Sequence, residues 1–591
     1  MPISSIHSFA AWSNSGRLLA ILFINLCLSA CSPPPQDFDA DIIIIGGGIA
    51  GLAAGLEASA GNSSVIGLEM NSVGGGHAVM AGGMFLVNTP LQAAKDVNDS
   101  VELAMADMLA WGEDADADWV RRYVQASRPQ VHDWLTQLGV EFALLMPAPG
   151  ETSVPRFHFT RGTAVNMVVP MMQAGLQRKK LQWLFNRRAI DLSALESGGW
   201  SIETRDERTG EPRTLLARQV IVTTGGFEND LERVRANWLP EVAQPERLLA
   251  GASHFARGSG LDLGANAGAA VSRLDHQTIF VTGLPNPRDP SGVDGLLAQN
   301  PNGIFVASDG KRFVNEAAPR KSQEIAVLGL ETQSYWLVFD ARGRRRLQIR
   351  GAPWLTRETL DTEILSNPVL VQRADSLEDL AQLAGLPAGE LRRTVDEFNN
   401  HLEMSLPDDF GRFGPAIESR PPAPIKQAPF YAMRLYPMTR KSMGGLQIND
   451  RGQVMDTDGQ PLPGLYAAGE VTGVAGINGS YGGSGTFLGP SVFTGRLAGR
   501  SAVEDRQNAS QAIDSEPAGV AVTDAALLDA QALAAMLASS RPGYWHFEQA
   551  HRLVQEKAWD CTDCHSEEWP TRPAVSPNEK RAQLESCARC H

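Results

Sequence analysis

The most regular pattern in the chain begins with an unbroken apolar run. Residues 42–45 are four consecutive isoleucines, which is typical of a strand buried on both faces of a parallel sheet. Glycines follow, and an Ala/Leu-rich segment from about Ile49 predicts a helix. A second short apolar run, at 65–68, predicts another strand that ends in Glu69. This order of strand, glycine turn, helix, strand and acid predicts a β-α-β unit.

The glycines of this unit have the spacing G-x-G-x-x-G, with Gly46, Gly48 and Gly51 at the three positions. Glycine permits a tight turn and lets the backbone approach a pyrophosphate, which then lies at the positive end of the following helix. Glu69 stands 18 residues beyond Gly51, where an acid can bind a ribose hydroxyl. An ordinary turn is the alternative, but the complete unit favours a dinucleotide site.

Two further glycine clusters follow closely behind this unit. One contains Gly75 and Gly76, and the other contains Gly82 and Gly83. Their position predicts backbone pressed against a flat ligand such as an isoalloxazine ring. A flexible loop is the alternative, because glycine serves both uses.

The remaining pattern predicts a first domain that is split by an insertion. Helical periodicity covers 91–140, and a second buried strand at 220–226 runs into paired threonines and glycines. Between 270 and 440, prolines and short strands alternate with helices, which predicts an inserted α+β domain. The first domain then resumes with a strand and turn at 464–470 and a closing helix near 490–503.

A polar and aromatic stretch at 153–163 contains Arg156, His158 and Arg161. A lone buried histidine is more often a satisfied core residue than a ligand. We therefore expect His158 to be structural.

Composition narrows the class of protein. The 591 residues suggest two to four domains, enough for a large core. The 52 basic and 67 acidic residues give a formal net charge of −15, which argues against nucleic acid as a partner. The six cysteines are confined to the two ends of the chain, so the main body holds no disulfide framework.

The N-terminal residues 1–31 predict an export signal. Arg17 supplies a positive charge, and the mostly apolar run at 18–30 is too short to span a bilayer comfortably. The run ends in Leu-Ser-Ala-Cys, which resembles a bacterial lipoprotein cleavage box with Cys31 as the acylated residue. An uncleaved anchor and an ordinary signal peptide are the alternatives. We expect a chain exported to the periplasmic side of a bacterial membrane and anchored there by lipid on Cys31.

The C-terminal tail contains two C-x-x-C-H motifs. They are formed by Cys561, Cys564 and His565, and by Cys587, Cys590 and His591. Each pair of thiols can add to the vinyl groups of one haem, while the histidine ligates the iron. A four-cysteine zinc site and a thiol–disulfide pair are alternatives. The histidine after both pairs and the export signal favour two covalent c-type haems.

Two further histidines in the tail, His546 and His551, match the two distal ligands that two haems need. We therefore expect bis-histidine haems. The alternative is that either histidine is a surface residue.

Four separated strings now agree. GGGIAG at 46–51, TTGG at 223–226, KRFVNE at 311–316 and GLYAAGE at 464–470 resemble the succinate dehydrogenase/fumarate reductase flavoprotein superfamily, which includes flavocytochrome c fumarate reductases and ketosteroid dehydrogenases. The resemblance covers about residues 40–503. It implies FAD as the cofactor and a capping domain that closes over the substrate. No second G-x-G-x-x-G is visible for NAD(P)H, so electrons are expected to use another route.

The expected fold is therefore α/β, with a split Rossmann-like FAD-binding domain, an inserted α+β capping domain and a small c-type cytochrome module. The expected parts are a lipoprotein-type signal peptide at 1–31, a tether at 32–40, FAD-binding segments at 41–270 and 442–505, a capping (substrate) domain at 271–441, a linker and helix at 506–540, and a dihaem tail at 541–591. The expected FAD contacts are Gly46, Gly48, Gly51, Glu69, Gly75, Gly76, Gly82, Gly83, Thr224, Gly225, Glu470, Thr486 and Leu488.

The resemblance also implies catalytic residues. Arg320 matches the arginine that follows the RFVNE string in fumarate reductases and acts as their proton donor. Lys441 stands where those enzymes have a histidine before TMGG, and His276 weakly resembles their HPT string and could line the site. The segment 477–483 lacks the substrate-binding arginine of GANRLGG. This departure puts fumarate itself in doubt, because a dicarboxylate needs several cationic partners.

The same segment resembles ketosteroid dehydrogenases, in which a tyrosine and a glycine four residues later bind the ketone oxygen. Tyr481 and Gly485 match that pair. Strings such as GGMFLVN at 82–88 and TRKSMGGLQ at 439–447 are similar to bacterial FAD-binding dehydrogenases of the ketosteroid-dehydrogenase-like kind.

Together these features predict an exported flavocytochrome c that interconverts saturated and α,β-unsaturated carbonyl or carboxyl compounds. Its electrons would pass through the two haems to a periplasmic or membrane quinol-linked carrier. The alternatives are a periplasmic reductase of an unsaturated carboxylic acid, similar to fumarate reductase, and a redox carrier that no longer turns over substrate.

Overall fold

The computed structural model describes residues 37–513, except 149, 162–163, 353 and 414–421. Several predicted parts lie outside the described residues. They are the export signal at 1–31, residues 32–36 of the tether, residues 514–540 of the linker and helix, and the dihaem tail at 541–591. Within the described part, no helix is both long enough and apolar enough to cross a membrane.

The first sheet carries the β-α-β unit. Its strand order is β20-β21-β9-β1-β2-β6, and β1 pairs in parallel with both β2 and β9. The strands are β1 (Ala40–Ile45), β2 (Val65–Leu68), β6 (Leu181–Leu184), β9 (Pro212–Val222), β20 (Gln453–Met455) and β21 (Pro461–Ala467). Ile42, Ile43 and Ile44 have no exposed surface, as expected for a strand covered on both faces.

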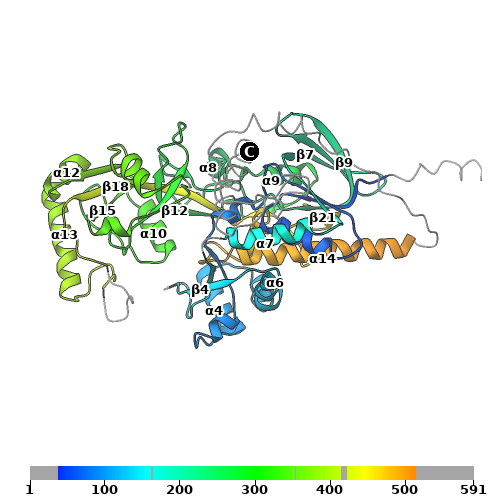
Figure 1. The fold of residues 1–591 in the computed structure, drawn as a ribbon, viewed down its shortest axis with the longest axis horizontal. Helices are drawn as coiled ribbons and strands as arrows, with labels where there is room; N and C mark the ends of the chain where they lie inside the picture. The colour runs from blue at the N-terminus through cyan, green and yellow to red at the C-terminus, as the bar shows by residue number, and fades with distance from the viewer. Residues whose placement is uncertain (1–36, 149, 162–163, 353, 414–421, 514–591) are drawn as a thin grey trace, which may run out of the picture. The chain divides into compact units, whose positions relative to one another are not determined.

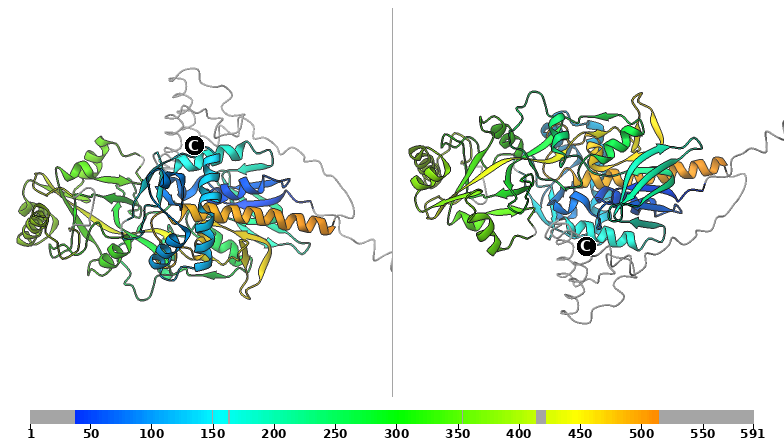
Figure 2. Two further views of the ribbon diagram at one scale, coloured as in Figure 1. Left: turned by 90° about the horizontal axis from the view of Figure 1, so that it is seen from below. Right: turned by 90° about the horizontal axis from the view of Figure 1, so that it is seen from above.

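Two helices from distant parts of the chain cover this sheet together. Helix α2 (Ile49–Ala58) follows the glycine turn, and α14 (Leu488–Ile513) packs along it (Figures 1 and 2). A side chain at Gly495 would lie 2.3 Å from the Ala50 carbonyl oxygen, so glycine is required where the two helices touch. Helix α7 (Val165–Leu176) also packs against α2.

A second sheet is organised around its long strand β18 (Phe430–Ser442). Its order is β14-β15-β18-β12-β13-β16, and β10 and β17 also pair with β18. The other strands are β10 (Leu249–Ala250), β12 (Gln277–Pro285), β13 (Gly295–Gln299), β14 (Ile304–Val306), β15 (Tyr335–Asp340), β16 (Gln348–Arg350) and β17 (Val371–Ala374). Its helices are α10 (Arg320–Leu328), α11 (Arg357–Thr359), α12 (Leu377–Ala384) and α13 (Ala388–Glu403).

A third, small sheet has the order β3-β5-β4, from β3 (Gly83–Phe85), β4 (Phe142–Met146) and β5 (Phe157–Thr160). The helical pattern at 91–140 is confirmed as α4 (Val101–Gly112), α5 (Ala117–Ala126) and α6 (Asp133–Gln137). The first sheet also contains β7 (Arg187–Ala194) and β8 (Trp200–Asp206), which join it through β9. The other α-helices and strands are α3 (Pro90–Ala93), α8 (Leu231–Ala236), α9 (Ser259–Asn266), and the pair β11 (Val271–Ser272) and β19 (Gly445–Leu446).

The sequence pattern placed the buried strands correctly but not all of their ends. Strand β9 begins at Pro212 rather than near 220, because its first half is a partly polar ribbon that pairs with β8. It ends at Val222, so the threonines and glycines after it form a turn. Helix α14 continues to Ile513, into the segment expected to be a linker.

Candidate active site

The turn between β1 and α2 is closed by glycine contacts. Gly46 has φ +108°, and a side chain there would lie 2.6 Å from the Thr223 carbonyl oxygen. A side chain at Gly51 would lie 1.9 Å from the Gly46 carbonyl oxygen. These two glycines therefore hold the strand, the turn and the helix together, as the spacing predicts.

Gly48 and Gly225 border open space, unlike Gly46 and Gly51. No atom lies within 4 Å of the position that a side chain would take at either residue, and both line a cavity at the carboxyl ends of β1 and β9. Gly48 is also the N-cap of α2 and provides no side-chain cap. The first backbone N–H groups of α2 therefore face an open cradle suited to a diphosphate.

Glu69 occupies the end of β2 at the same cavity. Its two carboxylate oxygens accept the backbone N–H groups of Gly47 and Asn71, each at 2.8 Å. Burial raises the pKa of Glu69 to about 7. The side chain is thus fixed at the rim of the cradle, next to the glycine turn.

Most of the expected FAD contacts meet in this first cavity, which we call the cofactor cavity. Those that line it are Gly46, Gly48, Glu69, Gly75, Gly76, Thr224, Gly225, Glu470 and Leu488. The Thr224 hydroxyl oxygen is buried and has no hydrogen-bond partner among the described residues, so a ligand can supply one. Gly51 and Thr486 do not line this cavity, and Gly51 packs against the Gly46 carbonyl oxygen instead. The residues present fit a dinucleotide such as FAD.

Gly82 and Gly83 have a packing role, and both line the second cavity described below, so their expected contact with a flat ligand stays a prediction. A side chain at Gly82 would lie 2.6 Å from the Phe159 ring, and one at Gly83 would lie 2.1 Å from the His158 carbonyl oxygen. Both glycines therefore let β3 pack closely against β5.

A buried cluster of ionisable groups lies at the inner end of the cofactor cavity. The backbone N–H of Ser442 donates to both Glu228 and Glu470, the latter at 3.3 Å. Lys441 Nζ lies 3.6 Å from Glu470 Oε2 and 3.4 Å from His77 Nδ1. Burial, and then the neighbouring Glu470, raise the pKa of Glu228 well above its ordinary value.

A second cavity, which we call the substrate cavity, has a volume of about 500 Å³. This volume is in the range of small-molecule sites, roughly 300–1,000 Å³. It is lined by residues of the small sheet, of β12, β13 and β18, and by the start of α10. Lys441, Phe487 and Leu488 line both cavities, so the two share a wall.

Four cationic side chains line the substrate cavity. They are Arg320, Arg350, Arg440 and Lys441. Glu151 is the one acidic residue among the described lining residues, and it accepts the Ser484 backbone N–H at 2.7 Å. The cavity is therefore suited to an anion.

The two central arginines are held by their surroundings. The Arg320 guanidinium carbon lies 4.5 Å from the centre of the Phe280 ring, and burial lowers the pKa of Arg320. Arg440 donates to the carbonyl oxygens of Gly251 and, at 3.4 Å, Met80, and burial lowers its pKa to about 10. Both guanidinium groups are positioned before any ligand binds.

The structure brings together some of the expected catalytic residues. Arg320, Lys441 and Gly485 all line the substrate cavity. Tyr481 does not line it, and its ring lies 4.1 Å from Lys321 Nζ. His276 also lies away from both cavities, with Nδ1 2.7 Å from Asp275 Oδ1. The roles expected for Tyr481 and His276 stay predictions.

The sequence analysis missed Arg350, Arg440, Glu228 and His77. Arg440 precedes Lys441 directly, and Glu228 follows the second glycine turn, so both stood beside motifs that had been recognised. His77 likewise follows the Gly75–Gly76 cluster directly, whereas no local pattern marks Arg350, which only the tertiary fold brings to the substrate cavity.

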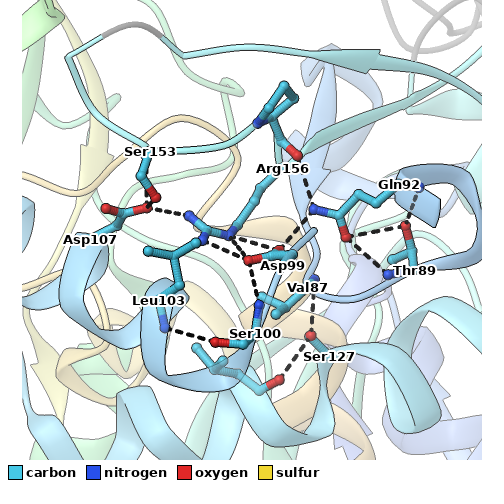
Figure 3. Close-up of polar contacts among 12 residues, drawn as sticks. Val87, Thr89, Gln92, Asp99, Ser100, Leu103, Asp107, Ser127, Ser153 and Arg156 are labelled. Carbon is cyan, nitrogen blue, oxygen red and sulfur yellow. Dashed lines mark hydrogen bonds and ion pairs between the residues drawn. The ribbon is translucent and has the colours of Figure 1, made fainter. Parts of the chain in front are cut away.

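The stretch at 153–163 contains β5, and Arg156, just before this strand, is held by a network of polar contacts (Figure 3). Arg156 and Asp99 have fully buried side chains, with Nη2 and Oδ1 2.7 Å apart, and Arg156 also pairs with Asp107. His158 is bonded through both ring nitrogens, to Thr89 and to the Arg156 carbonyl, each at 2.7 Å. Burial lowers the pKa of His158 to about 4, so the expectation of a structural histidine is confirmed.

Comparison with known proteins identifies the family. Residues 41–488 match the family described as FAD binding domain, and the chain belongs to it. The chain is 30% identical to a fumarate reductase (cytochrome) of Shewanella frigidimarina, over 80% of this chain and 79% of that one. It is 28% identical to a KsdD-like steroid dehydrogenase of Mycobacterium tuberculosis, over 80% and 97%.

A solved structure has the same fold. It is described as the open conformation of a flavocytochrome c3 fumarate reductase, with a TM-score of 0.63 and 24% identity over 84% of this chain and 82% of that one. The expected α/β FAD-binding fold is thus confirmed. The chain is an FAD-dependent oxidoreductase that acts on CH–CH groups.

Proposed function

We propose that the protein interconverts saturated and α,β-unsaturated carboxylic acids in the substrate cavity, with reduction of the double bond as its direction. One observation carries this proposal. Four cationic side chains line the substrate cavity, and one of them, Lys441, also lines the cofactor cavity. A carboxylate is the functional group that guanidinium groups bind best, through paired hydrogen bonds. The fumarate reductase named above is a relative whose substrate is such an acid.

The bound FAD supplies hydride exchange at the β-carbon. Arg440 and Lys441 lie at the end of β18 and bind the carboxylate, which withdraws electron density from the double bond. Arg320 stands at the N-terminus of α10 and donates a proton to the α-carbon. A guanidinium is nearly always protonated, so it suits donation, and its burial favours release of the proton. Two electrons and two protons are added to each double bond.

The ketone substrate of the original expectation is the second candidate. It is supported by Gly485, which lines the substrate cavity. Its partner Tyr481 lies against Lys321 and outside that lining, which favours the carboxylate.

Electron supply is the part of the proposal that rests on sequence. The two C-x-x-C-H motifs at 561–565 and 587–591 lie outside the described residues. We propose that they hold two c-type haems, that His546 and His551 supply the distal ligands, and that a quinol-linked carrier reduces them. Export of the protein and a lipid on Cys31 are likewise proposed from the sequence. The first relative named above is itself a cytochrome, which supports this arrangement.

One spectroscopic experiment tests both parts. The full chain is produced by export with haem maturation, reduced with dithionite, freed of excess reductant and mixed anaerobically with unsaturated acids or enones. Sharp c-type α and β bands with a flavin shoulder are expected, and an unsaturated acid should reoxidise both. If no compound reoxidises the protein, the reductase proposal fails. If no haem bands are present, the electron-transfer part fails and a zinc tail takes its place.

A further inference from the structure

One wall of the substrate cavity is uncharged, and we call it the apolar wall. It consists of Gly82, Gly83, Met146, Phe157 and Phe159. Four of these five residues belong to the small sheet β3-β5-β4. The four cations come from other elements, namely α10, β16 and β18. The cavity thus presents two chemically different surfaces to one ligand.

The alternation of side chains along β5 places the Phe157 and Phe159 rings on the same face of the strand. Along β5, His158 and Thr160 are buried, whereas Phe157 and Phe159 are partly exposed and line the cavity. Successive side chains of a strand point to opposite faces, so the two phenyl rings share one face. Their centres are 4.2 Å apart.

The glycines around the apolar wall make room for these rings. A side chain at Gly82 would lie 2.6 Å from the Phe159 ring, and one at Gly485 would lie 2.7 Å from the Phe157 ring. Any larger residue at either place would move a ring. The glycines therefore leave room at the cavity for both aromatic rings, whose planes are tilted by 51° to each other.

The apolar surface continues across the sheet to β4. Met146 pairs with Phe157, and Leu144 pairs with Phe159, so these side chains lie on the same face. Leu144 and Met146 are 53% and 47% exposed, which is unusual for two neighbouring large aliphatic side chains. Met146 lines the substrate cavity, so a ligand there would cover it, whereas Leu144 lies outside the lining.

We propose that the substrate is a monocarboxylate whose β-carbon carries a flat apolar group, as in a 3-arylpropenoate. The cations bind the carboxylate, and the aryl group lies on Phe157 and Phe159. A dicarboxylate would place its second charge against an apolar surface without a hydrogen-bond partner, which is costly. A neutral enone would leave the cations without an anion. This inference rests on the proposed function, because it names the acid that the cavity accepts.

Binding to the oxidised, FAD-loaded full chain tests the inference without turnover. Calorimetric titration compares three probes: 3-phenylpropenoate, fumarate and the neutral enone 4-phenylbut-3-en-2-one. The phenylpropenoate should bind at least about tenfold more tightly than either of the others, because only it satisfies both surfaces. Equal or tighter binding of fumarate overturns the apolar half of the inference, and equal or tighter binding of the enone overturns the carboxylate half.

Two variants test whether the phenyl group of the ligand binds to the apolar wall. Phe159→Ala should weaken phenylpropenoate about tenfold and leave fumarate unchanged. Leu144→Ser is the matched control, because Leu144 shares the sheet face with Phe159 but does not line the cavity, and it should change neither affinity. FAD content and the melting temperature are measured for both. If Phe159→Ala keeps its FAD and leaves phenylpropenoate binding unchanged, the apolar wall does not bind the substrate.

The outcome is distinguishable from failure of the proposed function. Binding is measured on oxidised protein, whereas the proposed function is tested by reoxidation of reduced protein. Fumarate that reoxidises the protein while phenylpropenoate neither binds nor reacts overturns this inference and preserves the proposed reductase.

Discussion

Glu228 and Glu470 accept hydrogen bonds from the same backbone N–H, that of Ser442. Glu228 is 1% exposed, and its second carboxylate oxygen has no partner among the described residues. Burial and the neighbouring Glu470 carboxylate raise the pKa of Glu228 and so favour its protonated form. Lys441, His77 and Arg440 face the pair, and Lys441 reaches into both cavities.

The first prediction concerns pH and stability. Burial and Glu470 raise the pKa of Glu228 in the folded protein, while the unfolded chain releases this proton above about pH 4.3. The stabilisation from the bound proton is complete below that pH and is lost as pH rises through the folded-state pKa. The melting temperature of Glu228→Gln should therefore exceed that of the parent protein by an amount that increases from pH 5 to pH 8. Each unit of pKa shift corresponds to about 1.4 kcal/mol.

The matched control is Glu232→Gln, an exposed glutamate in α8. Its melting temperature should follow the parent protein at every pH. A difference between Glu228→Gln and the parent that stays constant with pH would show that Glu228 is ionised in the folded protein.

The second prediction separates the roles of the turn glycines. Gly48→Ala should fold normally, because its side chain meets no atom within 4 Å, but it should bind FAD at least about tenfold more weakly, since the methyl group occupies the diphosphate cradle. Gly51→Ala should fail to fold stably, because its side chain would lie 1.9 Å from the Gly46 carbonyl oxygen. Flavin content and thermal unfolding measure the two effects, with Gly389→Ala as the control at an open site.

These glycines also show how far the sequence can predict this fold. Strands buried on both faces consist of apolar runs, so β1 and β2 were located to within two residues, and the glycine spacing identified the nucleotide turn. The order of these elements predicted a dinucleotide-binding unit, and the resemblance of four separated strings to a flavoprotein superfamily implied FAD. Ends of strands were less certain, because the first half of β9 pairs with β8 and carries polar residues.

The substrate cavity was predictable only in part. Arg320, Lys441 and Gly485 were identified by motif, but motif spacing does not determine where a side chain points. Tyr481 follows Gly479 and precedes Gly482, both with positive φ, and the resulting loop turns its ring to Lys321. Arg350 lies far from any motif. Gly82, Gly83, Phe157 and Phe159 lie in stretches that the sequence had marked, but only the packing of the sheets shows that they form one wall of the cavity.

The third prediction concerns proton donation. Arg320→Met should lower the rate of double-bond reduction by about 10²–10⁴-fold, the usual contribution of a positioned acid. FAD content should not change, because Arg320 does not line the cofactor cavity. Reoxidation of the reduced protein under stopped flow measures the rate. Lys321→Met, at the neighbouring residue, is the control and should keep most of the activity; equal loss in both variants would indicate damage to α10 rather than loss of a proton donor.

The fourth prediction concerns the ion pair behind β5. Arg156→Met should destabilise the protein by about 3–5 kcal/mol, because it leaves Asp99 buried without its cation. Arg188→Met removes an exposed pair with Glu207 and should cost about 0–1 kcal/mol. Urea unfolding followed by tryptophan fluorescence compares the two variants. A similar small effect in both variants would contradict a stabilising role for the buried Arg156–Asp99 pair.

The fifth prediction separates the tail from the flavin domain. The double substitution of Cys561 and Cys564 by alanine should remove one of two covalent haems, because both thioether bonds of that haem are lost. The same change at Cys587 and Cys590 should remove the other. Pyridine haemochrome absorbance divided by flavin absorbance should fall by half in each variant, while reoxidation of photoreduced flavin by an unsaturated acid continues, since the cavities lie within 37–513. Metal analysis is the deciding control: stoichiometric zinc in the unsubstituted chain, without haem, would assign the four cysteines to a zinc site.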